Sequence, residues 1–199
     1  MELTSAIRAR RMVRAFTGAP VDPATVDDLV DLARRAPSAG NSQGTRFLVL
    51  DQPEDVARYW DATLPEDRRA GFRWSGLIAA PVLVVVAVRP GAYVERYGEP
   101  DKVATGLGRG SDAWPVPYWW VDAGAAVEHL LLGATAAELG ACLFGLFEHE
   151  AAVVEAFGVE PGWRLVGTVA IGHPAPDGPG RSSARARRRL DEVLRRGTW

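Results

Sequence analysis

The feature that most constrains this chain is an unbroken apolar run from Val82 to Val88, directly after Pro81. β-Branched residues favour strands, and a strand without polar alternation must be covered on both of its faces. The run is far shorter than the roughly 20 apolar residues that a membrane span requires. We therefore predict a strand at the centre of a sheet, buried on both faces, and no membrane anchor.

Helix and strand patterns lie on both sides of this run. Asp22-Pro23 provides an N-cap and a first-turn proline, and apolar residues then recur at helical spacing to about Arg35, so a helix is predicted from Pro23 to Arg35. The other predicted helices cover Pro53–Thr63, Pro65–Leu77, Asp122–Leu139, with Asp122 as its cap, and Glu148–Phe157, and the other strands cover Phe47–Leu50, Cys142–Leu146 and Leu165–Ile171. This mixture, without an internal repeat, predicts an α+β fold in which helices pack on a sheet.

A chain of 199 residues is most simply a single domain, here residues 1–199. Residues 89–118 contain many Gly and Pro with scattered charges, which predicts a long active-site excursion rather than a core element. Residues 174–199 begin Pro/Gly-rich and then become basic, and the apolar residues of this tail, which would need a partner surface, are Leu190, Val193, Leu194 and Trp199.

The charge is distributed unevenly along the chain. The net charge is −2, but residues 1–14 hold four Arg against one Glu, and residues 181–199 hold seven Arg against Asp191 and Glu192. The acidic body opposes a polyanion and aromatic interleaving is missing, so nucleic-acid binding is not expected. A single Cys142 excludes an internal disulfide, and no signal-peptide pattern opens the chain, so we expect a cytoplasmic protein.

Several classes of site have no support in the sequence. No glycine-rich dinucleotide fingerprint or Walker-type phosphate loop is found. His129, His149 and His173 are scattered without a ligand spacing, so no metal site is expected. Ser38 and Ser42 lie in no nucleophile elbow, and hydrolytic catalysis is therefore not indicated.

Two segments carry positive information about chemistry. The segment from Arg10 to Phe16 is dense in guanidinium groups, and the segment from Pro37 to Gln43 is a loop of small polar residues. Guanidinium groups bind phosphate bidentately, and hydroxyl and amide groups satisfy a polyol that would otherwise be buried unpaired. The sequence therefore predicts a phosphorylated cofactor.

In kind and order these segments resemble the FMN-dependent nitroreductase family, from Ile7 to about Leu194. In that family the first helix ends in Arg-Arg/His-Ser-x-Arg/Lys-x-Phe, the next runs into Pro-Ser-x-x-Asn-x-Gln-Pro-Trp, a buried helix leads into a Gly-containing strand, and a Lys/Arg-x-Arg pattern follows near the C-terminus. This chain reads Arg10-Arg11-Met12-Val13-Arg14-Ala15-Phe16, Pro37-Ser38-Ala39-Gly40-Asn41-Ser42-Gln43-Gly44-Thr45, Cys142-Leu143-Phe144-Gly145 and Arg185-Ala186-Arg187-Arg188-Arg189. Each motif is weak by itself, but their order and spacing together are specific.

The resemblance implies a nitroreductase-like fold with a central, mostly antiparallel sheet flanked by helices, and FMN as the cofactor. It implies that Arg10 and Arg187, and also Arg185, hold the phosphate. By the same resemblance, Arg11 lies beside the phosphate or ribityl chain, and Arg14 serves the cofactor. The residues implied to line the ring and ribityl chain are Pro37, Ser38, Asn41 and Gln43, and those implied to place a backbone N–H against the isoalloxazine are Phe144 and Gly145.

Two positions depart from the family pattern. Met12 stands where the family usually has a hydroxyl that bonds the phosphate, so the neighbouring arginines must carry more of that contact. Gly44-Thr45 replaces the usual Pro-Trp, which removes an aromatic wall beside the substrate. The main cationic contacts are unchanged.

The resemblance implies an oxidoreductase that takes hydride from NADH or NADPH and reduces a flat, electron-poor acceptor of nitroaromatic or quinone type. Three residues are candidates for a wall over the ring, or alternatively for core or interface packing: Trp114, Tyr118 and Trp119. Two other functions stay open. Relatives of this kind carry out dehalogenation, flavin fragmentation or dehydrogenation, and a flavin- or deazaflavin-binding protein without turnover would share the same motifs.

The resemblance also implies an intertwined homodimer with its flavin sites across the interface. The helix predicted over Asp122–Leu139 is apolar around most of its circumference, and the apolar end of the basic tail requires a covering surface. We therefore expect an obligate homodimer with exchanged C-terminal segments and a small-molecule acceptor.

Overall fold

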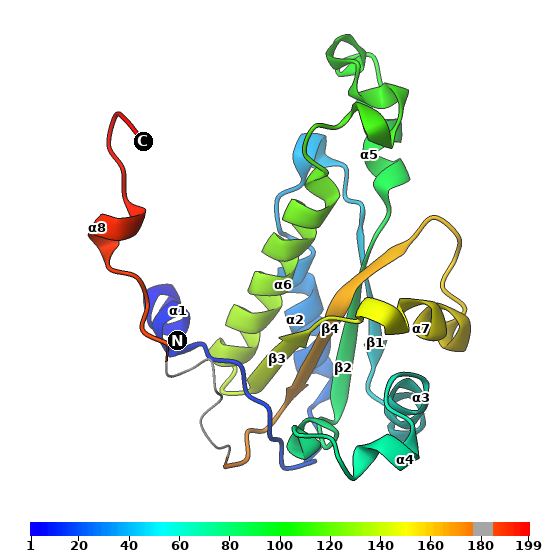
Figure 1. The fold of residues 1–199 in the computed structure, drawn as a ribbon, viewed down its shortest axis with the longest axis vertical. Coiled ribbons are helices and arrows are strands. Elements are labelled where there is room, and N and C mark those ends of the chain that lie inside the picture. The colour runs from blue at the N-terminus through cyan, green and yellow to red at the C-terminus, as the bar shows by residue number, and fades with distance from the viewer. Residues whose placement is uncertain (177–184) are drawn as a thin grey trace.

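The computed structural model describes residues 1–176 and 185–199, and Figure 1 shows a central sheet with helices on both faces. Within these residues the sheet has four strands in the order β1-β2-β4-β3, and each neighbouring pair is antiparallel. The strands are β1 (Thr45–Leu50), β2 (Val82–Val88), β3 (Gly140–Phe144) and β4 (Arg164–Gly172). The predicted α+β fold with a mostly antiparallel sheet is confirmed.

The apolar run forms β2, which pairs with both β1 and β4, and all of its residues are buried. Its side chains alternate between two hydrophobic clusters, because successive residues of a strand point to opposite faces. Val82, Val84 and Val86 pack into one cluster, and Leu83, Val85 and Ala87 pack into the other. The prediction of an inner strand buried on both faces is therefore confirmed.

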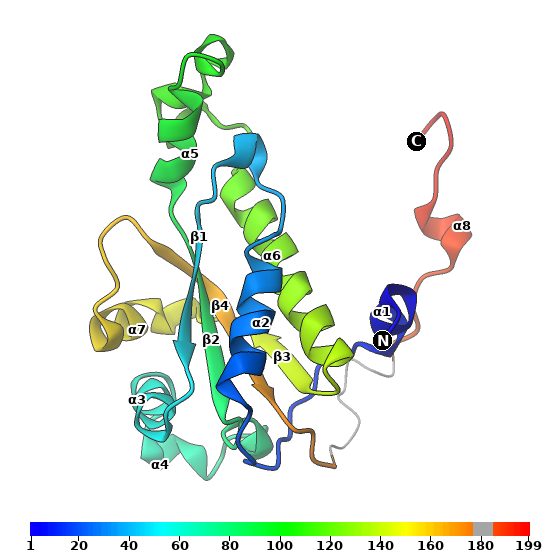
Figure 2. The same ribbon diagram turned by 180° about the vertical axis from the view of Figure 1, so that it is seen from behind.

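Each face of the sheet is covered by its own helices (Figures 1 and 2). Helices α2 (Pro23–Ala33) and α6 (Tyr118–Ala136) supply the cluster on one face, and α3 (Pro53–Thr63) and α7 (Glu150–Phe157) supply the cluster on the other. Helix α2 begins as expected from its sequence, since the carboxylate of Asp22 accepts a hydrogen bond of 3.0 Å from the Ala24 N–H.

The prediction of one helix over Pro65–Leu77 is wrong. Only α4 (Glu66–Arg69) and a 3-10 turn at Ser75–Leu77 form there. The carbonyl of Gly76 accepts the Phe16 N–H at 3.1 Å, and a Cβ on Gly76 would lie 2.8 Å from that of Ala15. A tertiary contact with the N-terminal segment therefore replaces the hydrogen bonding of a continuous helix.

The prediction that Asp122 caps the start of α6 is also wrong. The helix begins at Tyr118, after Pro117, and Asp122 lies inside it with only 8% of its surface exposed. Asp122 does not cap the helix, because its carboxylate accepts hydrogen bonds from residues outside α6. Local sequence rules favoured a capping role for Asp122 because they do not detect hydrogen-bond partners so far away in the chain.

Residues 89–118 contain a helix, where only an excursion was expected. Helix α5 (Pro90–Tyr97) and three short 3-10 turns make up an arm, defined here as residues 90–117, which projects from one end of the molecule in Figure 1. The arm has its own core, formed with the end of β2 and the start of α6: Val88, Ala92, Tyr93, Trp114, Trp119 and Ala123. Aromatic packing therefore orders a segment whose Gly and Pro content indicated a loop.

The two ends of the chain lie to one side of the sheet. Helix α1 (Leu3–Ala9) precedes an extended segment that runs beside β3, where Met12 forms a parallel bridge with Ala141. The C-terminal segment, with α8 (Leu190–Val193), leads away from the sheet beyond α1 (Figure 2). In the described residues, no helix combines the length and the apolar character that crossing a membrane would take.

Candidate cofactor site

The Pro37–Gln43 loop, predicted to line a cofactor, has a backbone conformation that side chains seldom adopt. Gly40, Asn41 and Gln43 have φ values of 61°, 57° and 50°. The left-handed region is open to glycine but strained for other residues, and such strain concentrates at functional sites. This loop is therefore held in place by its surroundings.

Hydrogen bonds within the loop fix part of this shape. The Gln43 N–H donates to Ser38 Oγ at 3.0 Å, and Ser42 Oγ donates to the Ala39 carbonyl at 2.6 Å. The Ser38 hydroxyl keeps its own proton for donation to a ligand, since here it acts as the acceptor. Part of the shape of the loop therefore comes from bonds within the loop itself.

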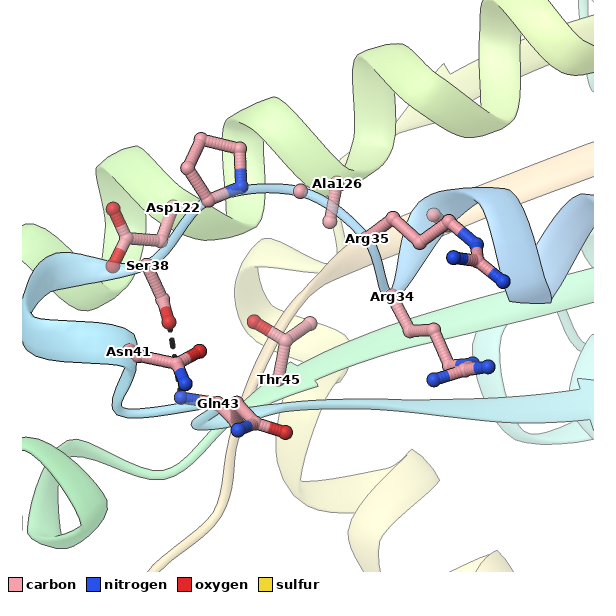
Figure 3. Close-up of a pocket in the computed structure, with 11 residues that line it drawn as sticks. Arg34, Arg35, Ser38, Asn41, Gln43, Thr45, Asp122 and Ala126 are labelled. Carbon is pink, nitrogen blue, oxygen red and sulfur yellow. Dashed lines mark hydrogen bonds between the residues drawn. The ribbon is translucent and has the colours of Figure 1, made fainter.

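The loop forms one wall of a polar cavity of about 530 Å³, called here the loop cavity. It is lined by Ala33, Arg34, Arg35, Ala36, Pro37, Ser38, Asn41, Gln43, Thr45, Asp122 and Ala126. Figure 3 shows Ser38, Asn41 and Gln43 at one end and Arg34 and Arg35 at the other. The structure thus brings together all four loop residues predicted to bind a cofactor.

The two arginines of the loop cavity are engaged elsewhere. Arg34 Nε and Arg35 Nε donate to the two carboxylate oxygens of Asp31, at 2.7 and 2.9 Å, so their guanidinium groups turn back along α2. Together they hold the pKa of Asp31 below its ordinary value. Sequence reasoning did not single out Arg34 and Arg35, although they directly precede the loop.

The buried carboxylate of Asp122 is the lining residue that sequence reasoning placed wrongly. Its Oδ2 accepts from the Ala39 N–H at 2.9 Å and from the Tyr93 hydroxyl at 2.8 Å. Burial, and then the hydrogen bond with Asp122, raises the pKa of the Tyr93 phenol, so Tyr93 remains a donor. No local signal connects Asp122 with a loop 83 residues earlier in the chain.

The N-terminal arginines lie along the edge of β3. Arg10 forms an ion pair with Glu128 of α6, with Nε and Oε1 3.2 Å apart. Arg14 donates to the Met12 carbonyl at 3.3 Å and lies 5.0 Å from the centre of the Trp74 ring. Arg11 is exposed, and Met12 is partly buried against the core, which accounts for an apolar residue at this position.

A second cavity of about 360 Å³, called here the strand-end cavity, lies where β3 ends. It contains three residues that the sequence predicted to serve a cofactor, Arg14, Phe144 and Gly145. Its remaining lining is Tyr59, Trp60, Thr63, Leu64, Phe72, Trp74, Leu77, Cys142, Leu143, Leu146, Phe147, Glu148 and His149. Arg14 thus lines a cavity that also holds six Phe, Tyr and Trp side chains, which fits a flat aromatic ring beside an anionic or polar group.

Gly145 leaves no room for a side chain, because the ring of Phe147 packs against its backbone. An ideal Cβ at this position would lie 2.8 Å from Cζ of Phe147. Phe147 itself is 86% exposed and has a φ of 41°, a strained value for an aromatic residue. The Phe147 ring therefore lies against the backbone at Gly145.

The sheet separates the two cavities. The loop cavity is lined by Ala33 and Ala126, from the helices that cover one face, and the strand-end cavity by Tyr59 and Trp60, from a helix that covers the other. Within one copy of the chain, the four loop residues and the group of Arg14, Phe144 and Gly145 therefore lie on opposite faces of the sheet.

The other predicted residues lie outside both cavities. Arg185 and Arg187 are exposed in the C-terminal segment and do not reach either cavity within the part of the chain that is described. Trp114 and Trp119 are buried in the hydrophobic core that the arm shares with the start of α6, where both pack edge-on against Tyr93, whereas Tyr118 is 45% exposed. Two of the three aromatic residues considered for a wall over the flavin ring therefore pack inside the arm core.

Over residues 1–176 and 185–199, no group of three or more His, Cys, Asp or Glu side chains could hold a metal ion.

Comparison with known proteins adds to these observations. The model of the nitroreductase family matches residues 7–173. A 5,6-dimethylbenzimidazole synthase of Rhodobacter capsulatus is 28% identical over 86% of this chain and 83% of its own. A protein of Archaeoglobus fulgidus, named for NADH dehydrogenase or NAD(P)H nitroreductase activity, is 23% identical over 87% of this chain and 86% of its own.

A solved structure gives the same result. A protein from Desulfovibrio desulfuricans, described as a nitroreductase in complex with FMN, is 27% identical and superposes with a TM-score of 0.69, covering 100% of this chain and 98% of its own.

Proposed function

This chain belongs to the nitroreductase family, and we propose that it is an FMN-dependent oxidoreductase that uses NADH or NADPH to reduce a flat, electron-poor acceptor of nitroaromatic or quinone type. The observation that carries the proposal is the pair of cavities, one polar and preformed and one aromatic beside Arg14. Together they offer the donors that a phosphorylated polyol and a flat ring require.

The residues of this chain would bind and orient the cofactor. Arg10 and Arg14 supply guanidinium groups for the phosphate side, and the FMN complex of the relative from Desulfovibrio desulfuricans supports the identity of the ligand. Ser38, Asn41 and Gln43 supply hydroxyl and amide groups for the ribityl chain. FMN, when bound, supplies the hydride and electron chemistry, so the chain needs no catalytic acid or base of its own.

The position of the two cavities supports a homodimer. Because the sheet separates them, a cofactor that contacts both groups must take one group from each of two copies. Large apolar side chains that remain exposed in the single chain agree with this arrangement: Leu3, Ile7, Val116, Val121, Phe147, Leu190, Val193 and Trp199. The C-terminal segment would then cover the partner copy, as expected from its apolar end.

The acceptor would lie against the arm of one copy. Tyr97, Trp114 and Tyr118 line a shallow groove of about 450 Å³ that also includes Ala39 of the loop. Aromatic walls suit a flat acceptor, and Tyr118 is the exposed member of the three aromatic residues predicted there. Trp114 and Trp119 support this wall from the arm core.

An absorbance spectrum of the purified protein tests the proposal. We expect flavin bands, followed by bleaching when NADH or NADPH is added under anaerobic conditions and by recovery when a quinone or nitroaromatic is added. A protein without flavin bands that takes up none from added FMN would sink the proposal. A flavin that neither nicotinamide reduces would favour a binding protein without turnover.

A second function is favoured by the similarity to 5,6-dimethylbenzimidazole synthase. In this alternative the chain would act on the flavin itself, with dioxygen as co-reactant, and would leave external acceptors untouched. The two functions are separated by incubating the protein with reduced FMN in air and analysing the products by mass spectrometry. Formation of 5,6-dimethylbenzimidazole would support the alternative, whereas intact FMN with rapid quinone reduction would support the first proposal.

A further inference from the structure

The strained loop is held from outside by a buried carboxylate. Ala39 N–H donates to Asp122 Oδ2 at 2.9 Å, and the same oxygen accepts from the Tyr93 hydroxyl at 2.8 Å. Asp122 is 8% exposed, so both bonds lie in a site with little competing water. One oxygen atom of α6 thereby ties α5 to the beginning of the loop.

An arginine of the arm holds the next carbonyl of the loop. Arg96 Nε donates to Gly40 O at 2.8 Å. The other two nitrogens of this guanidinium bind the carboxylate of Asp101 bidentately, at 2.7 and 2.8 Å, which fixes the direction of the fork. Only 22% of the Arg96 side chain is exposed, so its position is set by packing as well as by charge.

Two aromatic rings of α5 pack against the backbone of the loop, one at Gly40 and one at Gly44. An ideal Cβ would lie 2.8 Å from the Tyr97 ring at Gly40 and 2.5 Å from the Tyr93 ring at Gly44. The loop therefore has its hydrogen-bond partners and its steric limits on the same element.

The left-handed residues of the loop need such support, since Asn41 and Gln43 would relax toward ordinary φ values without it. We propose that Arg96 and Asp122 are positioning residues for the cofactor. They hold the loop so that Ser38, Asn41 and Gln43 face the cofactor together. The arm thus contributes to cofactor affinity, and Arg96 acts on the loop through its hydrogen bond to Gly40 O. This inference rests on the proposed function, because the ligand toward which the loop directs these side chains is FMN.

A pair of variants, one in α5 and one at the N-cap of α5, tests the inference. Arg89 forms a bidentate ion pair with Glu95, at 2.6 and 2.7 Å, and within the described residues no hydrogen bond or ion pair joins its side chain to residues 38–43. Both Arg96→Ala and Arg89→Ala therefore remove a bidentate ion pair, and Arg96→Ala also removes the bond to Gly40 O and the ion pair of Arg96 with Glu99 at 3.0 Å. We expect the dissociation constant for FMN to rise about tenfold in Arg96→Ala, and to change less than about twofold in Arg89→Ala, by fluorescence titration.

Conservative variants exclude a general effect on folding. Arg96→Lys retains a donor for Gly40 O and should recover part of the affinity, and Asp122→Asn retains an acceptor for Ala39 N–H and should lose less than Asp122→Ala. Thermal unfolding of each variant identifies loss of fold. Equal FMN affinity in Arg96→Ala and Arg89→Ala, with both folded, would overturn the inference.

Amide hydrogen exchange in the absence of FMN separates this inference from the proposed function. We expect the Ala39 and Gln43 amides to exchange faster in Arg96→Ala than in the wild type, and to be unchanged in Arg89→Ala. If the wild type binds no FMN but this pattern is found, the proposed function fails and the support of the loop by Arg96 stands. If exchange in the two variants is the same, the support itself is refuted.

Discussion

Gly44 has no space for a side chain, because the ring of Tyr93 lies against it. An ideal Cβ would be 2.5 Å from the ring and 3.2 Å from the Arg89 carbonyl. The proline usual at this position in the family would meet the same ring. The buried Tyr93 side chain therefore requires a glycine at position 44.

Gly44→Ala should lower the free energy of unfolding by about 1–3 kcal/mol, because the ring or the loop must shift to admit the methyl group. Gly91→Ala is the control, since its Cβ would have only ordinary contacts, at 3.5 and 3.7 Å, and alanine favours a helix. Urea unfolding measures both. An unchanged stability of Gly44→Ala would show that Tyr93 is not fixed against the loop.

Arg10 forms an ion pair with Glu128 of α6. If Arg10 holds the FMN phosphate, Arg10→Ala should raise the dissociation constant for FMN about tenfold or more, as should Arg187→Ala. Glu128→Gln should have the opposite sign and strengthen binding a few-fold, because a carboxylate beside the phosphate is removed.

Fluorescence titration gives these constants. Arg58→Ala provides the control, since Arg58 pairs with Asp55 on α3 and is exposed. If Arg10→Ala binds FMN as tightly as Arg58→Ala does, the phosphate is held elsewhere.

At the scale of elements, the first residue of α7 joins that helix to the start of β4. Glu150 accepts from Arg164 Nε at 2.8 Å and from the Leu165 N–H at 2.9 Å. The hydrogen bond with Arg164, and then that with Leu165, holds the pKa of Glu150 below its ordinary value of 4.5. The stabilisation by Glu150 is therefore fully present above this value and is lost as the pH falls through the folded pKa.

Glu150→Gln should cost about 1 kcal/mol of unfolding free energy near neutral pH, because the charged acceptor of three hydrogen bonds is lost. The difference from the wild type should shrink as the pH falls below 4.5. Denaturant unfolding at a series of pH values measures it. Glu160→Gln serves as control, because its ion pair with Arg46 is exposed on both sides and should contribute almost nothing. A constant difference down to the acid limit would contradict the assignment.

The elements also show where sequence patterns hold and where they fail. The periodicity after Asp22-Pro23 and the apolar run of β2 report local requirements that the fold satisfies, so α2 and β2 were predicted well. The Pro65–Leu77 pattern was overridden by the bond from Phe16 to Gly76. A hydrogen bond to a distant segment leaves no periodic trace in the sequence.

For the whole molecule, the proposed homodimer makes a strict prediction. Arg14 and Asn41 lie in cavities on opposite faces of the sheet, so each cofactor would use Arg14 of one copy and Asn41 of the other. Homodimers of Arg14→Ala and of Asn41→Ala should both bind FMN weakly. A mixed dimer of the two variants contains one intact site and one site with both defects.

Co-expression with two different affinity tags isolates the mixed dimer. We expect it to recover about half of the wild-type flavin content per chain, as simple combination requires. Sedimentation of the wild type should show a dimer. A stable, flavin-loaded monomer, or a mixed dimer no better than its parents, would refute a site shared between copies.

The sequence by itself determined the α+β fold, the inner strand and the loop of small polar residues, because these depend on residue type and short-range spacing. The identity of the predicted cofactor residues came from motif order, and their roles remain predictions. Only the tertiary structure decided that Asp122 and Arg96 hold the loop, that α5 orders the arm, and that the sheet separates the two cavities. Each of these depends on contacts between residues far apart in the chain, which the folded packing alone brings together.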